Sequence, residues 1–171
     1  TTPDATITAD RLILATNGYS VETVPDWIRA RTLPAQSSVI ATRPLTQAEL
    51  DAQGWTTHQM AYEDRRLLHY FHLTPDNRMV FGQRGGLIAS AANDARIAER
   101  VRGDFARAFP HWAHVETRSN WSGMVCLTAS LTPFCGAIPG LPGAFAAFGY
   151  HGNGVAMGSY LGMLLADVSR G

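Results

Sequence analysis

Residues Phe145-Ala-Ala-Phe-Gly-Tyr-His-Gly-Asn-Gly154 decide the fold, because they carry an apolar run through three glycines directly into a helical pattern. The pattern predicts a buried strand over Ala144–Tyr150 and a helix from about Asn153 to Ser169. Such a turn lets the backbone approach a ligand closely, and it points the N–H groups at the start of the helix toward an electron-rich oxygen. The glycines also fit an alternative role, helix-to-sheet packing alone, so the turn by itself identifies no ligand.

Near the start of the chain, the sequence predicts a strand without neighbours of its own. Arg11–Thr16 is apolar and β-prone, and Asn17-Gly18 closes it, as expected of a buried strand that meets a turn. Buried parallel strands arrive through βα units, and no such unit precedes this segment. The chain is therefore expected to be the latter part of a longer protein.

The middle of the chain predicts an antiparallel sheet. A first strand is expected at Ser37–Thr42. Leu67–Leu73 and Arg78–Gln83 flank Thr74-Pro-Asp-Asn77, and the proline at the second position predicts a type I turn. These two segments are therefore expected to form a hairpin.

A helix is predicted to cover one face of this sheet. Between Ala91 and Phe109 the apolar residues recur at helical spacing, and Pro110 ends the run. A further strand is expected at Glu116–Trp121. The following segment contains three prolines and is expected to be a loop.

Composition excludes several classes of protein. The 14 basic residues balance 14 acidic ones, so no net field attracts nucleic acid or an anionic membrane. All the basic residues are arginine, and the absence of lysine excludes a Walker phosphate loop and a Schiff-base lysine in this chain. Cys126 and Cys135 are too few to staple the fold, and nothing resembles a secretory leader at Thr1, so we expect a cytoplasmic setting. The longest apolar run, Val155–Val168, is too short for a membrane anchor.

Three motifs together carry a family resemblance. They are Ala9-Asp-Arg-Leu-Ile-Leu-Ala-Thr-Asn-Gly-Tyr19, Leu33-Pro-Ala-Gln-Ser-Ser-Val-Ile-Ala-Thr-Arg-Pro-Leu45, and the segment from Trp121-Ser-Gly123 through Thr128, Pro133 and Gly136 to Gly149-Tyr-His-Gly-Asn-Gly154. In this order, over nearly the whole chain, they resemble the FAD-dependent amine and amino-acid oxidases of the D-amino-acid-oxidase type. Within that family the chain is most similar to the gamma-glutamylputrescine oxidoreductase-like branch, which is related to glycine and sarcosine oxidases.

The resemblance implies an α+β fold in two parts. Residues 31–133 would form the substrate-binding domain, an antiparallel (mixed) sheet with a covering helix. Residues 1–30 and 134–171 would supply a strand-helix remnant of a Rossmann-like FAD-binding domain. The family carries a Gly-rich fingerprint for the FAD pyrophosphate near its N-terminus, and this chain has no such segment. The chain is therefore expected to be the C-terminal portion of such an enzyme.

The resemblance also implies which residues contact FAD, which would bind non-covalently in a site that this chain leaves incomplete. They lie in the two turns described above: Thr16, Asn17, Gly18, His151, Gly152, Asn153, Gly154 and Val155. His151 is assigned near the cofactor, although a loop histidine is as often a hydrogen-bonded spacer. Some sarcosine oxidases attach their flavin through a cysteine in the stretch around Cys126, but its neighbours resemble the non-covalent branch, so we expect a small buried side chain.

The substrate would lie against one face of the hairpin. Tyr70 and His72 are expected on that face, with Arg78, Phe81 and Gln83 across the turn, although a solvated strand pair is an equal alternative. Arg84, Arg65 and Arg66 are candidates to bind a substrate carboxylate. Of these, Tyr70, His72 and Arg84 are assigned to substrate binding, and no catalytic residue is assigned.

The expected reaction of the parent enzyme is oxidative deamination of a small amine or amino acid by hydride transfer to FAD, with dioxygen or another acceptor reoxidising the flavin. This chain alone is expected to bind FAD weakly or not at all and to be inactive. The alternative is a non-catalytic binding or assembly module, which forms a homodimer or associates with the N-terminal half. His111, His114 and Glu116 form only a weak metal pattern, so no metal is predicted.

Overall fold

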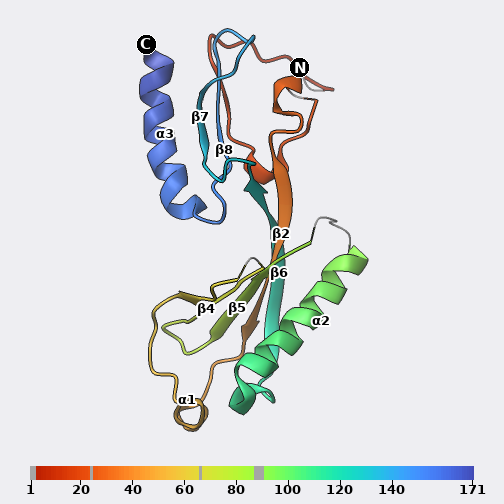
Figure 1. Ribbon diagram of the computed structural model, residues 1–171, viewed down its shortest axis with the longest axis vertical. Helices are drawn as coiled ribbons and strands as arrows, with labels where there is room; N and C mark the ends of the chain where they lie inside the picture. The colour runs from red at the N-terminus through yellow and green to blue at the C-terminus, as the bar shows by residue number, and fades with distance from the viewer. Residues whose placement is uncertain (1–2, 24, 66, 87–90) are drawn as a thin grey trace. The chain divides into compact units, whose positions relative to one another are not determined.

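The computed structural model describes residues 3–23, 25–65, 67–86 and 91–171, and it has an α+β fold (Figure 1). The chain divides into two compact units, one formed by Thr1–Pro34 and Met124–Gly171 and the other by Ala35–Gly123. Strand β6 (Thr117–Leu127) runs from the second unit into the first. The assignment of the units to FAD and substrate stays a prediction.

The unit Ala35–Gly123 is built on a five-stranded sheet of order β3-β4-β5-β2-β6. Its other strands are β2 (Leu33–Thr42), β3 (Ala61–Tyr62), β4 (His69–Leu73) and β5 (Met79–Arg84). The predicted hairpin is confirmed, since β4 pairs antiparallel with β5 from His69↔Gln83 to Leu73↔Met79. The N–H of Asn77 donates to the carbonyl oxygen of Thr74 at 2.9 Å, which closes the turn.

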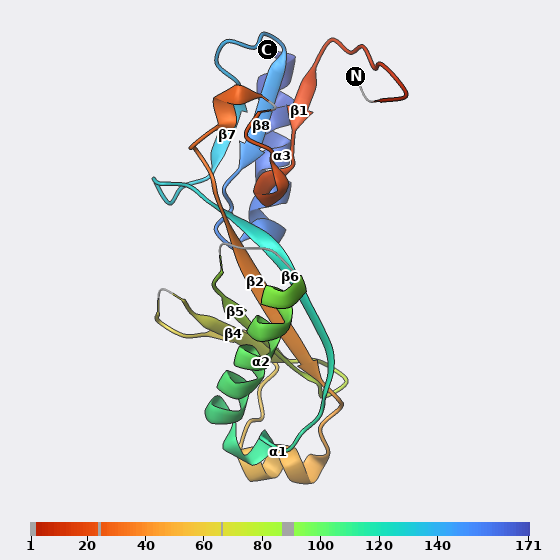
Figure 2. The same cartoon turned by 90° about the vertical axis from the view of Figure 1, so that its right-hand side faces the viewer.

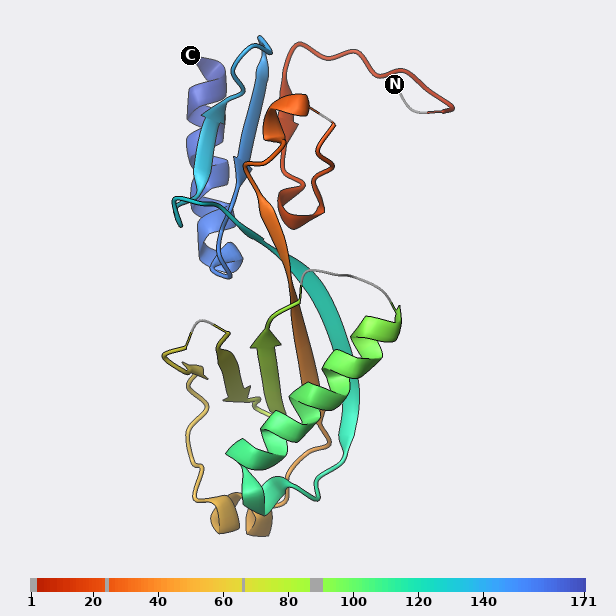
Figure 3. The same cartoon turned by 45° about the vertical axis from the view of Figure 1, so that its right-hand side comes forward.

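Helix α2 (Ala91–Ala108) covers one face of this sheet, as predicted (Figure 3). Its buried side chains Val101 and Phe105 pack with Phe81 and Ile40 of the sheet. A short helix, η3 (Pro110–Trp112), follows directly and buries Trp112 in the same core. The apolar spacing therefore identified both the helix and the face that it buries.

Helix α1 (Gln47–Gln53) was not predicted, although its start carries a sequence signal. Thr46 and Glu49 form a capping box, in which each side chain bonds to the backbone N–H of the other. The Glu49 carboxylate also binds the Arg43 guanidinium through two bonds of 2.9 and 2.6 Å. These bonds from Arg43 and Thr46, and a further one from His114, hold the pKa of Glu49 well below its usual range.

Glu49→Gln is expected to lower the free energy of unfolding at pH 7 by about 1.5–3 kcal/mol, because it removes the charge from the bonds to Arg43. A carboxyl group with a lowered pKa in the folded state stabilises above its ordinary value of 4.5 and loses that contribution as the pH falls below it. The difference between wild type and variant should therefore shrink in acid, which urea unfolding at several pH values measures. Asp51→Asn on the same helix is the control, and a difference that stays constant with pH would contradict the account.

The unit of Thr1–Pro34 and Met124–Gly171 contains a three-stranded sheet of order β1-β8-β7 (Figure 2). Strand β1 (Leu12–Leu14) runs parallel to β8 (Ala144–Phe148), and β7 (Phe134–Ala137) runs antiparallel to it. Helix α3 (Gly154–Arg170) packs on β7 and β8 through the buried residues Leu161 and Leu165. Two short helices, η1 (Asn17–Tyr19) and η2 (Asp26–Ile28), lie between β1 and β2.

Two expectations for this unit are wrong. The first strand is not buried, since Leu12 and Ile13 are 53% and 50% exposed. Helix α3 packs on β7 and β8, and no residue of β1 belongs to that cluster. The segment expected to be a loop contains β7, because tertiary pairing with β8 overrides the turn signals of the surrounding prolines. The last strand and the last helix are confirmed within one or two residues at each end.

Candidate functional site

The two segments predicted to contact a cofactor meet at one end of the β1-β8-β7 sheet, where β1 and β8 finish. Because β1 and β8 are parallel, the segments that follow them leave the sheet at the same end. The side-chain oxygen of Asn17 accepts a hydrogen bond of 3.0 Å from the N–H of Gly149. This bond joins the turn after β1 to the turn that leads into α3, across 132 residues of sequence.

Both turns depend on backbone that only a few residue types tolerate. Asn17 and His151 have positive φ angles of 45° and 53°, and Gly149 and Gly152 have 81° and 99°. A Cβ at Gly149 would lie 2.5 Å from a methyl carbon of Thr128. A Cβ at Gly18 would lie 2.6 Å from the carbonyl oxygen of Met124. The turns are therefore tightly packed against the end of β6 and the residues that follow it.

The start of α3 is open to solvent and carries no side-chain cap. The first helical bond runs from the N–H of Met157 to the carbonyl oxygen of Asn153. The N–H groups of Gly154, Val155 and Ala156 therefore have no carbonyl partner within the helix. Val155 is 96% exposed and Asn153 provides no cap hydrogen bond. This helix end is suited to an oxygen with partial negative charge.

His151 is held by hydrogen bonds on both its backbone and its ring. Its N–H donates to the carbonyl oxygen of Cys126 at 3.3 Å, and its Nε2 lies 3.0 Å from the hydroxyl oxygen of Thr128. These contacts fit the spacer alternative, in which the ring fixes the turn. A role near the cofactor stays a prediction.

The Cys126 thiol is buried, and burial raises its pKa although a backbone hydrogen bond from Gly149 opposes this. A thiol with a raised pKa is a poor nucleophile at neutral pH. Both cysteines are free. The side chain packs with Ile28, Ile138 and Phe148, as a small apolar residue does.

Tyr70, His72 and Arg84 share one face of the sheet in the unit Ala35–Gly123. Tyr70 pairs with Gly82 in the β4–β5 register, and Arg84 lies two residues further along β5. The Tyr70 hydroxyl oxygen lies 2.8 Å from that of Ser37, and its ring lies over Gly82, where a Cβ would meet it at 2.3 Å. These side chains face away from α2.

The expectation that Phe81 and Gln83 share this face is wrong. Phe81 pairs with Phe71, and Gln83 pairs with His69, so the two residues lie on the face that α2 covers. Phe81 is fully buried there against Phe105. Alternation along β5 separates odd from even positions, and the sequence alone did not show which set faces the helix.

Of the other arginine candidates, Arg65 is committed to neighbouring residues. Its guanidinium bonds to Glu63 at 2.7 Å and lies 2.8 Å from Nδ1 of His69. Arg66 lies outside the described residues. Arg78, expected across the turn from Tyr70 and His72, bonds to Asp76 at 2.7 Å.

The sequence analysis missed a buried histidine between two carboxylates. Nδ1 of His69 lies 2.8 Å from a Glu63 oxygen, and Nε2 lies 3.1 Å from an oxygen of Asp104. Bonds from Arg65 and from His69 outweigh burial and lower the pKa of Glu63. The network links β4 to α2. The residues next to His69 in the sequence, Leu68 and Tyr70, did not indicate that its ring faces the helix.

One histidine of the weak pattern His111, His114 and Glu116, from which no metal is predicted, has another partner. Nε2 of His114 lies 3.0 Å from a Glu49 oxygen. Within the described residues, no group of three or more His, Cys, Asp or Glu side chains is placed to hold a metal ion. Over the same part of the chain, no helix is both long enough and apolar enough to cross a membrane.

The match to a family of known sequences assigns the chain to a class of flavoenzymes. Residues 1–168 match the FAD dependent oxidoreductase family (DAO), and the chain belongs to it. The resemblance drawn from the three motifs is thereby confirmed.

Two relatives in sequence are a probable oxidoreductase OrdL of Rhizobium meliloti and gamma-glutamylputrescine oxidoreductase of Escherichia coli. The first is 31% identical over 99% of this chain, and the second is 30% identical over 96% of it. The chain spans about 38% of the length of each.

Two solved structures share the fold. Glycine oxidase from Geobacillus kaustophilus superposes with a TM-score of 0.74 at 18% identity, over 98% of this chain and 43% of that one. Iminodiacetate oxidase from Chelativorans superposes with a TM-score of 0.72 at 20% identity, over 97% of this chain and 44% of that one.

Proposed function

We propose that this chain is the C-terminal part of an FAD-dependent oxidoreductase that deaminates a small amine or amino acid. The observation that carries the proposal is the Asn17–Gly149 hydrogen bond, which holds the turn after β1 against the turn that starts α3. In this proposal, Thr16, Asn17, Gly18 and residues 151–155 contact the flavin. FAD, when bound, supplies the hydride acceptor.

The residues of these turns fit a flavin ring. The N–H groups at the start of α3 can donate to the oxygen at the pyrimidine edge of the ring. The positive end of the helix dipole stabilises the negative charge that develops on the flavin when it is reduced. Gly152 adds no side chain where a flat ring would approach. Val155, in the first turn of α3, is exposed. Gly158 and Gly162 also leave open space where a Cβ would project, so helix-to-sheet packing does not explain them.

The face with Tyr70, His72 and Arg84 fits a small substrate. An arginine can bind a carboxylate through two parallel hydrogen bonds, and an aromatic ring supports the apolar part of an amino acid. The contact of Tyr70 with Ser37 and Gly82 fixes the position of its ring. In the proposed reaction these residues orient the C–N bond and exclude water, while dioxygen or another acceptor takes the electrons afterwards.

A binding or assembly module is the second candidate, and one observation favours it. Apolar side chains are exposed on β1 and along α3, notably Leu12, Ile13, Tyr160, Met163 and Val168. Another copy of the chain, or the N-terminal half of the enzyme, would cover them. Light scattering over a dilution series separates a homodimer from a chain that stays monomeric.

The test replaces the matched region of the Rhizobium meliloti relative with this chain. The folded hybrid is expected to keep a visible flavin band after desalting, and one of a panel of amines and amino acids should bleach that band without oxygen. The isolated chain is expected to keep little or no flavin and to show no turnover. A hybrid that melts cooperatively but holds no flavin would contradict the proposal.

Val155→Asp in the hybrid is expected to weaken FAD binding about tenfold, because a carboxylate at the start of α3 repels the flavin oxygen and occupies the positive helix end. Flavin titration of the apoprotein measures this. Val168→Asp, near the other end of the same helix, is the matched control and should leave the affinity unchanged. Equal affinities for the two variants would place the flavin elsewhere.

A further inference from the structure

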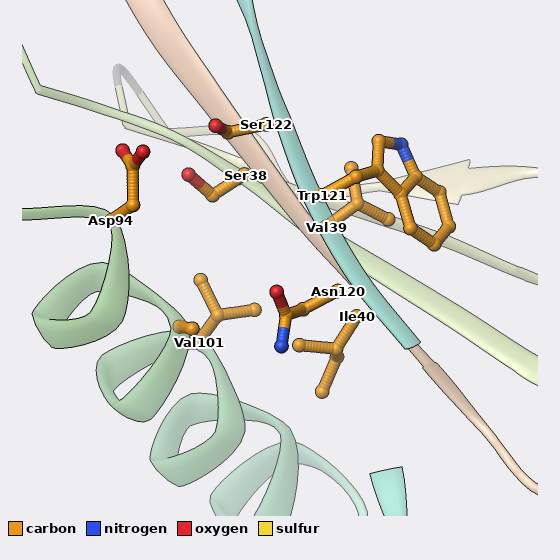
Figure 4. A pocket seen from close by; sticks show the side chains of 9 residues that line it. Ser38, Val39, Ile40, Asp94, Val101, Asn120, Trp121 and Ser122 are labelled. Carbon is orange, nitrogen blue, oxygen red and sulfur yellow. The ribbon is translucent and has the colours of Figure 1, made fainter. Parts of the chain in front are cut away.

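A cavity of about 210 Å³ lies in the unit Ala35–Gly123, between the first turns of α2 and strands β2 and β6 (Figure 4). It opens on the sheet face that α2 covers, whereas Tyr70, His72 and Arg84 lie on the other face. Its polar lining side chains are Ser38, Asp94, Asn120 and Ser122. None of the residues assigned to the flavin or the substrate contributes to it.

Ser38 is a buried lining residue whose hydroxyl group has no partner within the part of the chain that the structure describes. The residue is 5% exposed, and its hydroxyl oxygen is buried. Figure 4 shows the hydroxyl groups of Ser38 and Ser122 directed to the side on which the Asp94 carboxylate lies. A buried polar atom without a partner is uncommon in folded proteins and indicates a missing donor or acceptor.

The charge of the lining residues and the volume of the cavity indicate which kind of ligand it can bind. Among the described residues that line the cavity, Asp94 alone is charged, and its Oδ1 accepts a hydrogen bond from Gln36. The cavity is also lined by the second oxygen of this carboxylate, the hydroxyl groups of Ser38 and Ser122, and the amide of Asn120. Together these groups offer more hydrogen-bond acceptors than donors, around one negative charge. Ile40, Ala98 and Val101 supply an apolar wall. The volume lies below the range of pockets for drug-sized ligands, so the ligand is small.

We infer that this cavity binds a small primary ammonium ion with a short carbon chain. The ammonium donates to Oδ2 of Asp94 and to the hydroxyl oxygens of Ser38 and Ser122. The carbon chain packs against Ile40 and Val101, and a terminal hydroxyl reaches the Asn120 amide. One carboxylate with neutral oxygens and an apolar wall favours an organic cation over Ca²⁺, which takes more oxygen ligands, carboxylates among them.

Calorimetric titration of this chain with ethanolamine hydrochloride, once a cooperative melting curve has shown that it folds, tests the inference. Saturable binding is expected in the millimolar range, with no binding of ethylene glycol, which has the same size and no charge. Magnesium chloride and potassium chloride are separate arms, and saturation by either salt with none by ethanolamine would overturn the inference in favour of an inorganic cation site. Absence of saturation by all three cations would indicate a cavity filled by water alone and would also overturn it.

Two variants and a matched control locate the binding. Asp94→Asn keeps an acceptor for Gln36 and should weaken ethanolamine binding about tenfold through loss of the charge. Ser38→Ala removes a hydroxyl without a partner, so it should weaken binding severalfold while its melting temperature stays the same or rises. Glu99→Gln, exposed on the same helix, should change neither. Unchanged binding in both cavity variants would overturn the site.

Discussion

Replacing Phe81 with alanine is expected to lower the free energy of unfolding by about 3–5 kcal/mol, the range for a large aromatic side chain removed from a core. Phe81 is fully buried at the centre of the β4–β5–β2 sheet. Its ring contacts those of Phe71, Phe105 and Phe109, with centroid distances from 5.7 to 6.0 Å. The loss is large because a rigid sheet and a helix on one side cannot close the cavity that remains. Urea unfolding followed by circular dichroism measures it.

Tyr62→Ala is the matched control for this substitution. Tyr62 is an aromatic residue of the same sheet, but it is 73% exposed. Its replacement should change the free energy of unfolding by less than about 1 kcal/mol. Similar losses in the two variants would mean that the core is not centred on Phe81.

Gly149→Ala is expected to destabilise the unit that holds α3 by about 2–4 kcal/mol, through strain and crowding together. Its φ of 81° is unfavourable for alanine, and the added Cβ would lie 2.5 Å from Thr128. Movement of this turn also lengthens the bond from the Gly149 N–H to Asn17. In the hybrid enzyme, the flavin band should therefore decrease along with the melting temperature.

Gly158→Ala provides the opposite expectation within the same part of the chain. Gly158 lies inside α3, and a Cβ there meets no atom within 4 Å. Alanine should raise the stability by roughly 0.5–1 kcal/mol, because glycine loses more conformational freedom on folding. Destabilisation by this variant would indicate that a neighbour covers the helix face.

For Gly149→Ala, a stability equal to that of the wild type would contradict the prediction and would show that the turn can relax.

Local patterns were sufficient for the elements whose signals lie within a short stretch of sequence. The spacing of Val101, Phe105 and Phe109 identified α2 and its buried face. The turn Thr74–Asn77 identified the hairpin, since proline and asparagine favour the dihedral angles that it needs. Helix α1 carried an equally local signal in the Thr46/Glu49 capping box, which the sequence analysis did not use.

Other features depend on partners that are distant in sequence. Strand β7 forms because β8 provides its hydrogen bonds, and β1 is exposed because α3 packs on β7 and β8 instead. The register of β5 with β4 and β2 determines the face on which Phe81 lies. Alternation along the sequence shows which residues share a face, but it does not show which face the helix covers. The cavity beside Ser38 exists only where α2 packs across β2 and β6.

The sequence by itself determined the family, the two long helices, the hairpin and the glycine turn, because each rests on residues that are neighbours along the chain. Only the tertiary structure decided that Asn17 bonds to Gly149, that Phe81 lies on the face opposite Tyr70, and that His69 lies between two carboxylates. Contacts across as many as 132 residues depend on strand order and register. Those are set by the burial of the whole core, and no local pattern encodes them.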